Sequence, residues 1–178
     1  DYLAHVAHLF ATHPQVGALG GRSLPEFETE PAPWVREFFP LLALRDPGNQ
    51  SVIATSLAPP GSARMEYPAA AAPIGAGMVL RRESVQAWLA DFSAHDLPDR
   101  RGGQLTSGGD NDIVLSVLGH GGLVGYFPGL ALTHLIPASR LTRAYLAQLN
   151  RGIQRSWMQV LTKHHANPWP PVPRWTVP

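Results

Sequence analysis

The 178-residue sequence contains no cysteine, which excludes disulfide bonds and thiolate metal sites and fits a cytoplasmic protein. Charged residues are scarce, at 15% of the chain. No uninterrupted apolar run reaches the ~18 residues that a membrane-spanning helix needs. Hydrophobic residues make up 44% of the chain, so a chain of this length can bury one substantial core.

Acidic residues are absent from the C-terminal part of the sequence. Residues 1–112 carry all 13 acids and 8 basic residues, a net charge of −5. Residues 113–178 carry 6 basic residues and no acid, a net charge of +6. Two explanations remain open: the two parts could pack together and neutralise each other, or the basic part could face phosphate groups or anionic lipid.

Helical and strand patterns alternate along the chain, which predicts an α/β fold with a mixed sheet flanked by helices. Helices are expected over residues 3–10, 34–39, 83–92, 110–120 and 142–163. Strands are expected over residues 16–21, 74–82, 123–127 and 130–134, the last two joined by a turn at Pro128-Gly129. Loops are expected over residues 24–33, 45–67 and 96–109, and residues 166–178 form a proline-rich irregular tail.

Asp110 and Asp112 are the last acids of the chain, and Gly108-Gly109 precedes them. A carboxylate at the junction of a glycine loop and a helix can be held rigidly toward a cleft, which suits a general base. The glycines also allow a bulky ligand to approach the backbone. The structural alternative is that Asp110 is the N-cap of the helix and that Asp112 complements the helix dipole.

His134 ends an apolar strand, and Arg140 follows it closely. An imidazole can join carboxylates around a Mn²⁺-type ion, and a guanidinium can bind diphosphate through paired hydrogen bonds. The alternative is a structural histidine. Arg151 and Arg155 are candidates for phosphate binding too, or belong to a solvated helix face.

Two further pairs of histidines lie on predicted helices. His5 and His8 lie away from the apolar face of their helix and lack a third ligand, so we expect them to face solvent. His164 and His165 end the long C-terminal helix, and we expect them to interact with its last carbonyl groups.

The order of these segments resembles a family 2 glycosyltransferase of the GT-A fold, from its middle to its end. The stretches that carry the resemblance are residues 1–3, 13–22, 75–82, 108–113, 125–128 and 132–137. Together they span nearly all of residues 1–165, which would form the acceptor and catalytic-base half of the domain. The sequence contains no glycine-rich dinucleotide fingerprint, no P-loop and no nucleophile elbow, so none of these motifs points to another enzyme class.

The resemblance implies transfer of a sugar from a nucleotide-sugar donor to the hydroxyl of a glycan or lipid-linked acceptor, with inversion at the anomeric carbon. It also implies a divalent cation, Mn²⁺ or Mg²⁺. The family's acidic motif is Glu-Asp followed two residues later by another acid. The base of that motif falls on Asp110 and the later acid on Asp112, so both are expected to be catalytic, whereas Gly109 replaces the usual Glu.

The resemblance assigns the other site residues as well. His134 and Arg140 are expected to face the donor diphosphate, with His134 also near the metal. The acceptor side is expected to consist of Gly75, Ala76, Gly77, Met78 and Gly109.

The family's nucleotide-binding half ends in an Asp-x-Asp metal motif, which should come just before Tyr2 and is missing at that position. The chain starts without Met, at Asp1, inside a helical pattern. We therefore expect an incomplete catalytic domain that is inactive by itself. Its open sheet edges could pair with another copy. The expected location is the cytoplasm, either free or at the inner face of the membrane, and no nucleic-acid partner is expected.

Two other functions remain open. A non-catalytic module could use the basic helix 142–163 against a membrane surface or a partner, with Trp157 on its apolar face. A metal-dependent hydrolase could instead use Asp110, Asp112 and His134 as ligands.

Overall fold

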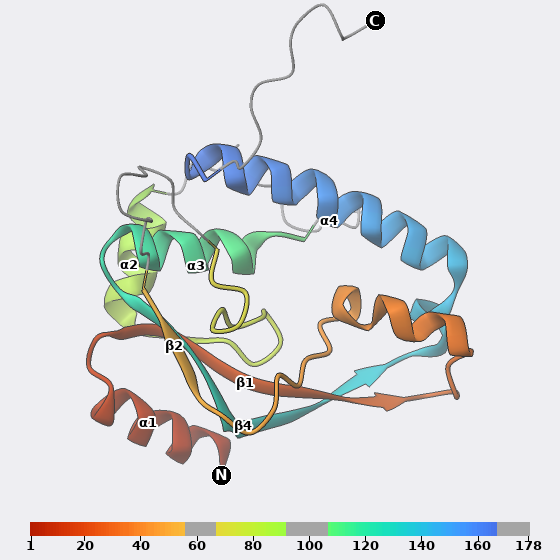
Figure 1. Cartoon of the computed structure of the whole chain (residues 1–178), viewed down its shortest axis with the longest axis horizontal. Helices are drawn as coiled ribbons and strands as arrows, with labels where there is room; N and C mark the ends of the chain where they lie inside the picture. The colour runs from red at the N-terminus through yellow and green to blue at the C-terminus, as the bar shows by residue number, and fades with distance from the viewer. Residues whose placement is uncertain (56–66, 92–106, 167–178) are drawn as a thin grey trace, which may run out of the picture.

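The computed structural model describes residues 1–55, 67–91 and 107–166. Residues 56–66 and 96–106 of the predicted loops and residues 167–178 of the predicted tail lie outside this part. A mixed four-stranded sheet, in the order β2-β4-β1-β3, carries helices on its faces (Figure 1), which confirms the predicted α/β class. The strands are β1 (Val16–Phe27), β2 (Val52–Ala54), β3 (Val79–Leu80) and β4 (Leu123–Ile136). The helices are α1 (Tyr2–Thr12), η1 (Pro33–Leu42), α2 (Arg82–Asp91), α3 (Gly109–Gly119), η2 (Ala138–Leu141) and α4 (Arg143–Lys163), where η marks 3₁₀ geometry.

The central pair of strands, β1 and β4, is parallel and longer than the sequence predicted. The loop predicted over residues 24–33 begins too early, because β1 continues to Phe27, which pairs with Ile136 of β4. Residues 24–26 of this extension are exposed, whereas Phe27 packs in the core around η1.

The predicted turn at Pro128-Gly129 is also wrong, because β4 passes through these residues without reversing. Gly20 pairs with Tyr126 and Arg22 with Ala131, so β4 holds extra residues between the two pairs. These residues form an irregular bulge, where proline is tolerated because it need not donate a ladder hydrogen bond. The bulge also bears on the two histidines of α1 that we expected to face solvent. His8 is exposed, as predicted, whereas His5 is half-buried, with its Nδ1 3.2 Å from the Gly129 carbonyl oxygen.

The other two strands are short edge strands. The predicted strand over 74–82 shrinks to β3, which pairs antiparallel with β1, because Gly77 adopts a φ of +80° and breaks the extended conformation before it. Strand β2 was not predicted. It lies in the predicted excursion from residue 45 and pairs antiparallel with β4.

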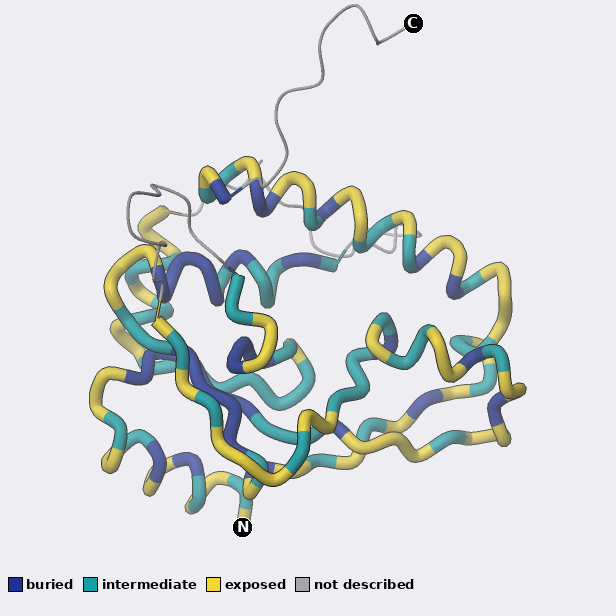
Figure 2. The backbone as a smooth tube through the Cα atoms, viewed as in Figure 1, coloured by how far each residue is buried: buried dark blue, intermediate teal, exposed yellow. Residues whose placement is uncertain are grey.

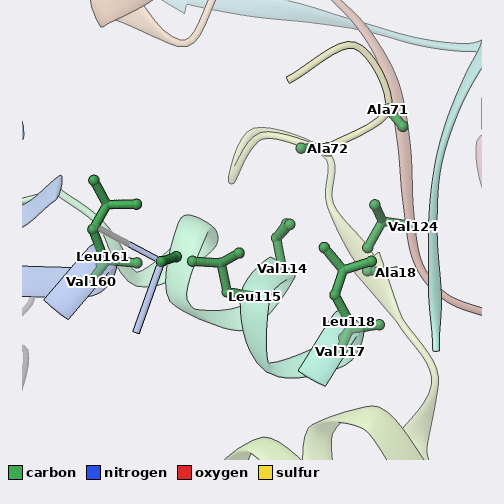
Figure 3. Close-up of a cluster of buried hydrophobic side chains, with 11 residues drawn as sticks. Ala18, Ala71, Ala72, Val114, Leu115, Val117, Leu118, Val124, Val160 and Leu161 are labelled. Atoms are coloured by element: carbon green, nitrogen blue, oxygen red, sulfur yellow. The ribbon is translucent and has the colours of Figure 1, made fainter. Parts of the chain in front are cut away.

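Helix α3 lies between the sheet and α4, so the molecule is layered (Figure 1). Its residues 114–118 are all buried, and Figure 2 shows burial along most of its length. In the core of Figure 3, Leu115 and Leu118 of α3 pack with Val124 of the sheet and Val160 of α4. A helix that is apolar on all sides belongs in such an interior position. Helix α1 covers the opposite face of the sheet.

Helix α4 confirms the stripe predicted for the long C-terminal helix. Thr142 caps it by accepting a hydrogen bond from the Tyr145 backbone N–H at 3.3 Å. Leu149 and Ile153 pack against η1, whereas Trp157 and Val160 pack against α3. None of the helices in the described part of the chain is long and apolar enough to cross a membrane.

Candidate functional site

The first turn of α3 carries the acidic motif. Its N-cap is Gly108, so the predicted capping role of Asp110 is wrong. A Cβ on Gly108 would lie 3.0 Å from the Cβ of Ser156, so the start of α3 packs closely on α4. Asp110 follows inside the helix as a half-buried residue at the surface end of this turn.

The Asp110 carboxylate is held by a loop from another part of the chain. Its Oδ2 accepts a hydrogen bond from the Gly75 N–H at 3.0 Å, and its Oδ1 accepts one from the Asn111 N–H at 2.9 Å. Gly75 is exposed, so this carboxylate lies where a ligand can approach it. Two backbone donors fix its direction and leave further lone pairs on the two oxygens.

The predicted acceptor-side residues divide into two sets. Gly75 contacts Asp110, and Gly109 directly precedes it in α3. Gly77 instead accepts a hydrogen bond from the Tyr2 hydroxyl at 2.5 Å, and the side chain of Met78 packs against the core beneath α3.

Tyr67 is a member of the site that the sequence did not reveal. Its hydroxyl donates to the Asn111 side-chain oxygen at 2.5 Å, and its ring packs edge-on against Trp157. Burial raises the pKa of Tyr67 far above its ordinary value, the charge of Asp110 raises it further, and Arg45 opposes them. The hydroxyl therefore keeps its proton. Tyr67 ends a predicted loop with weak periodicity, so no sequence signal marked it.

Asp112 is completely buried, in contrast to Asp110. Its carboxylate accepts hydrogen bonds from Trp88 Nε1 at 2.8 Å, Lys163 Nζ at 3.0 Å and His164 Nε2 at 2.7 Å. Burial alone would raise the pKa of Asp112, but the bonds from His164, Trp88 and Lys163 and the charge of Lys163 hold it below its ordinary value. Any contribution of Asp112 to catalysis must therefore pass through its neighbours.

The end of α4 confirms one prediction and bears on the charge asymmetry. The backbone N–H groups of His164 and His165 bond to the last carbonyl groups of α4, at Val160 and Thr162, and the ring of His164 additionally bonds to Asp112. Lys163 and Asp112 are an ion pair between the basic and acidic parts of the chain. Arg151 and Arg155 are exposed and form no ion pair with the residues that the structure describes.

His134 lies on β4 beside Ala43 and is half-buried. Burial lowers the pKa of His134, the positive charge of Arg140 lowers it further, and the backbone of Ala43 opposes both. Its Nδ1 is enclosed and makes no hydrogen bond with the described part of the chain. A neutral imidazole with an unused nitrogen suits a metal ligand.

In the described part of the chain, no hydrogen bond or ion pair joins His134 to Asp110. Leu132, two residues before His134 and so on the same strand face, approaches within 2.3 Å of a Cβ built on Gly77, in the loop that binds Asp110. No three His, Asp or Glu side chains within residues 1–55, 67–91 and 107–166 are grouped as metal ligands. His134 is therefore not part of such a group in the described residues.

Comparison with known proteins gives no relative. No protein-family model matches the sequence, and no curated protein or solved structure is significantly similar to it.

Proposed function

We propose that this chain is the acceptor and catalytic-base half of an inverting, family 2-like glycosyltransferase of the GT-A fold, with Asp110 as the general base. The observation that carries the proposal is the contrast between its last two acids. Asp112 is buried and bonded from two helices, whereas Asp110 two residues away reaches the surface with a fixed carboxylate. A base needs such a rigid and accessible position.

In the proposed reaction, Asp110 removes the proton of the acceptor hydroxyl while that oxygen attacks the anomeric carbon of the donor sugar. The new bond joins the acceptor oxygen to this carbon, and the bond from the carbon to the diphosphate breaks on the opposite side. The electron pair leaves with the diphosphate oxygen, so the configuration at the carbon inverts. The Gly75 N–H would hold the carboxylate toward the acceptor throughout.

On the donor side, Arg140 and His134 would bind the diphosphate. When bound, Mn²⁺ or Mg²⁺ would neutralise the charge of the diphosphate as it leaves. His134 offers one nitrogen to such an ion, and its depressed pKa keeps the ring neutral near pH 7. The carboxylate ligands belong, in this proposal, to an Asp-x-Asp motif outside residues 1–178.

The experiment compares residues 1–178 with the longest natural form of the protein. Both are incubated with Mn²⁺, a mixed glycan acceptor pool and, in turn, UDP-glucose, UDP-N-acetylglucosamine, UDP-galactose and GDP-mannose. Release of nucleoside diphosphate is measured, and the anomer formed is read by NMR. We expect release by the longer form only, with an inverted product. Turnover by residues 1–178 would contradict the half-site, and a retained configuration would contradict the mechanism.

A second candidate, a non-catalytic membrane-binding module, is favoured by the exposed Arg151 and Arg155 on a helix that contains no acid. Co-sedimentation with phosphatidylcholine vesicles, with and without phosphatidylglycerol, tests it at low and high salt. Salt-sensitive binding to the anionic vesicles, together with no response to any nucleotide sugar, would replace the transferase proposal. The hydrolase alternative has no such support, because Asp110, Asp112 and His134 are not grouped around one point.

A further inference from the structure

The end of α4 and the first turn of α3 are joined by a buried charged cluster, formed by Asp112, Lys163, His164 and Trp88. We propose that Lys163 and His164 are positioning residues, which fix the direction of the Asp110 carboxylate through Asp112. This inference rests on the proposed role of Asp110 as the base. It adds the residues that make that base rigid, and these lie more than 50 positions away in the sequence.

Three consecutive residues of α3 are each bonded to residues outside that helix. Asp110 bonds to Gly75, Asn111 bonds to Tyr67, and Asp112 bonds to the cluster. Consecutive residues of a helix point about 100° apart, so these bonds restrain the turn from three directions. Of the three residues, Asp112 is buried, whereas Asp110 and Asn111 are half-buried. In its bonds, 1% of the Asp112 side chain, 20% of the Lys163 side chain and 13% of the His164 side chain are exposed.

The charged character of the cluster is informative, because two helices can be joined without burying charge. Replacing a buried ion pair by packed apolar groups is often neutral or stabilising, and in some proteins such a pair serves to fix a specific geometry. The same first turn of α3 carries the half-buried carboxylate of Asp110. A displacement of about 1 Å at a catalytic group can lower a rate roughly 100-fold, so such restraint has a use there.

The test reads the contact between Gly75 and Asp110 directly by NMR on the 178-residue protein at pH 7. The amide proton shift of Gly75 is measured in the wild type and in Asp110→Asn, which defines the value without the carboxylate. We expect Lys163→Met and His164→Gln to move this shift most of the way to the Asp110→Asn value. Lys163→Arg, which retains the charge, should restore it.

The amide of Gly122 is the control, because it bonds to the Val117 carbonyl at the other end of α3. Its shift should stay unchanged in every variant. A wild-type Gly75 shift in both Lys163→Met and His164→Gln would overturn the proposal. So would loss of the Gly122 signal in both, since the cluster would then hold the whole fold and not this turn.

An activity measurement separates this inference from the proposed function. In a form of the protein that turns over a nucleotide sugar, the two variants should lower kcat about 10–100-fold and leave the KM for the donor unchanged. If the Gly75 shift moves in the two variants but the wild type shows no transferase activity, the positioning role of Lys163 and His164 stands and the proposed function is refuted. Unmoved shifts in an active enzyme would refute the positioning alone.

Discussion

At the scale of single residues, two carboxylates in one helical turn have opposite surroundings. The sequence marks Asp110 and Asp112 as a pair, because both follow the glycines and no acid comes after them. It does not show which of them is buried, since that depends on Lys163 and His164, which reach Asp112 only through the packing of α4 on α3. Spacing alone therefore marked the acidic pair and left open which of its two members is buried.

Replacing Asp112 by Ala should lower the free energy of unfolding by ~3–5 kcal/mol, because Lys163 and His164 would lose their buried partner. The folded-state pKa of Asp112 is depressed, so its contribution is complete above the unfolded value of about 3.9 and is lost as the pH falls through the folded value. Urea unfolding from pH 7 to pH 3 should show a constant difference that shrinks below about pH 4.

Asp46→Ala is the matched control, because Asp46 pairs with Arg22 at the surface with 47% of its side chain exposed. This substitution should lower the free energy of unfolding by less than ~1 kcal/mol at any pH. Equal losses in the two variants would show that Asp112 is not the buried, partnered group described.

Substitutions of Gly77 and Gly121 by Ala distinguish the cost of backbone strain from the cost of a steric clash. Both have a φ of +80°, but a Cβ on Gly77 would lie 2.3 Å from the Leu132 side chain, whereas a Cβ on Gly121 would meet nothing. Substitution by Ala should cost about 1–2 kcal/mol at Gly121 and ~1 kcal/mol or more beyond that at Gly77. Thermal unfolding measures both, and equal losses would contradict the contact with β4.

At the scale of elements, periodicity predicted the helices well and the strands less well. The stripe of α4 and the apolar run of α3 are local signals, readable from the residues themselves. The bulge in β4 is not local, because Pro128-Gly129 is also the usual composition of a turn. Its course is decided by the pairing of both flanks of β4 with β1, over 100 positions away.

The bulge predicts a severe effect at Gly21. A Cβ there would lie 1.8 Å from the Leu130 carbonyl oxygen and 2.5 Å from that of Phe127, and backbone atoms in a ladder cannot move aside cheaply. Gly21→Ala should destabilise the protein by about 3 kcal/mol, the upper end of overpacking costs. Gly75→Ala, whose Cβ would make only ordinary contacts from 3.5 Å, should change unfolding little. A mild loss at Gly21 would mean that the bulge is placed elsewhere.

At the scale of the whole molecule, the alternation of helices and strands was enough to predict the fold class. The strand order and the short edge strands were not predictable, because β2 and β3 owe their existence to pairing with β4 and β1. The site has the same origin: Gly75, Tyr67 and His164 meet the first turn of α3 only because α3 lies between the sheet and α4.

This layered arrangement predicts that α3 carries the stability of the molecule. Leu115 is fully buried, so Leu115→Ala should cost ~2–5 kcal/mol through lost burial and the cavity left behind. Leu89→Ala, at a leucine that is 54% exposed on α2, should cost about 0.5 kcal/mol or less. Similar unfolding curves for the two variants would contradict the interior position of α3.

The central claim, that Asp110 is the base, is tested most directly by Asp110→Asn in an active form of the protein. Asparagine keeps the shape of the side chain and cannot accept the proton, so kcat should fall ~100–10,000-fold while binding of the donor is unchanged. Glu83→Gln, which neutralises another first-turn acid at an exposed position on α2, should leave kcat as it is. Near-normal turnover by Asp110→Asn would contradict the account and place the base elsewhere.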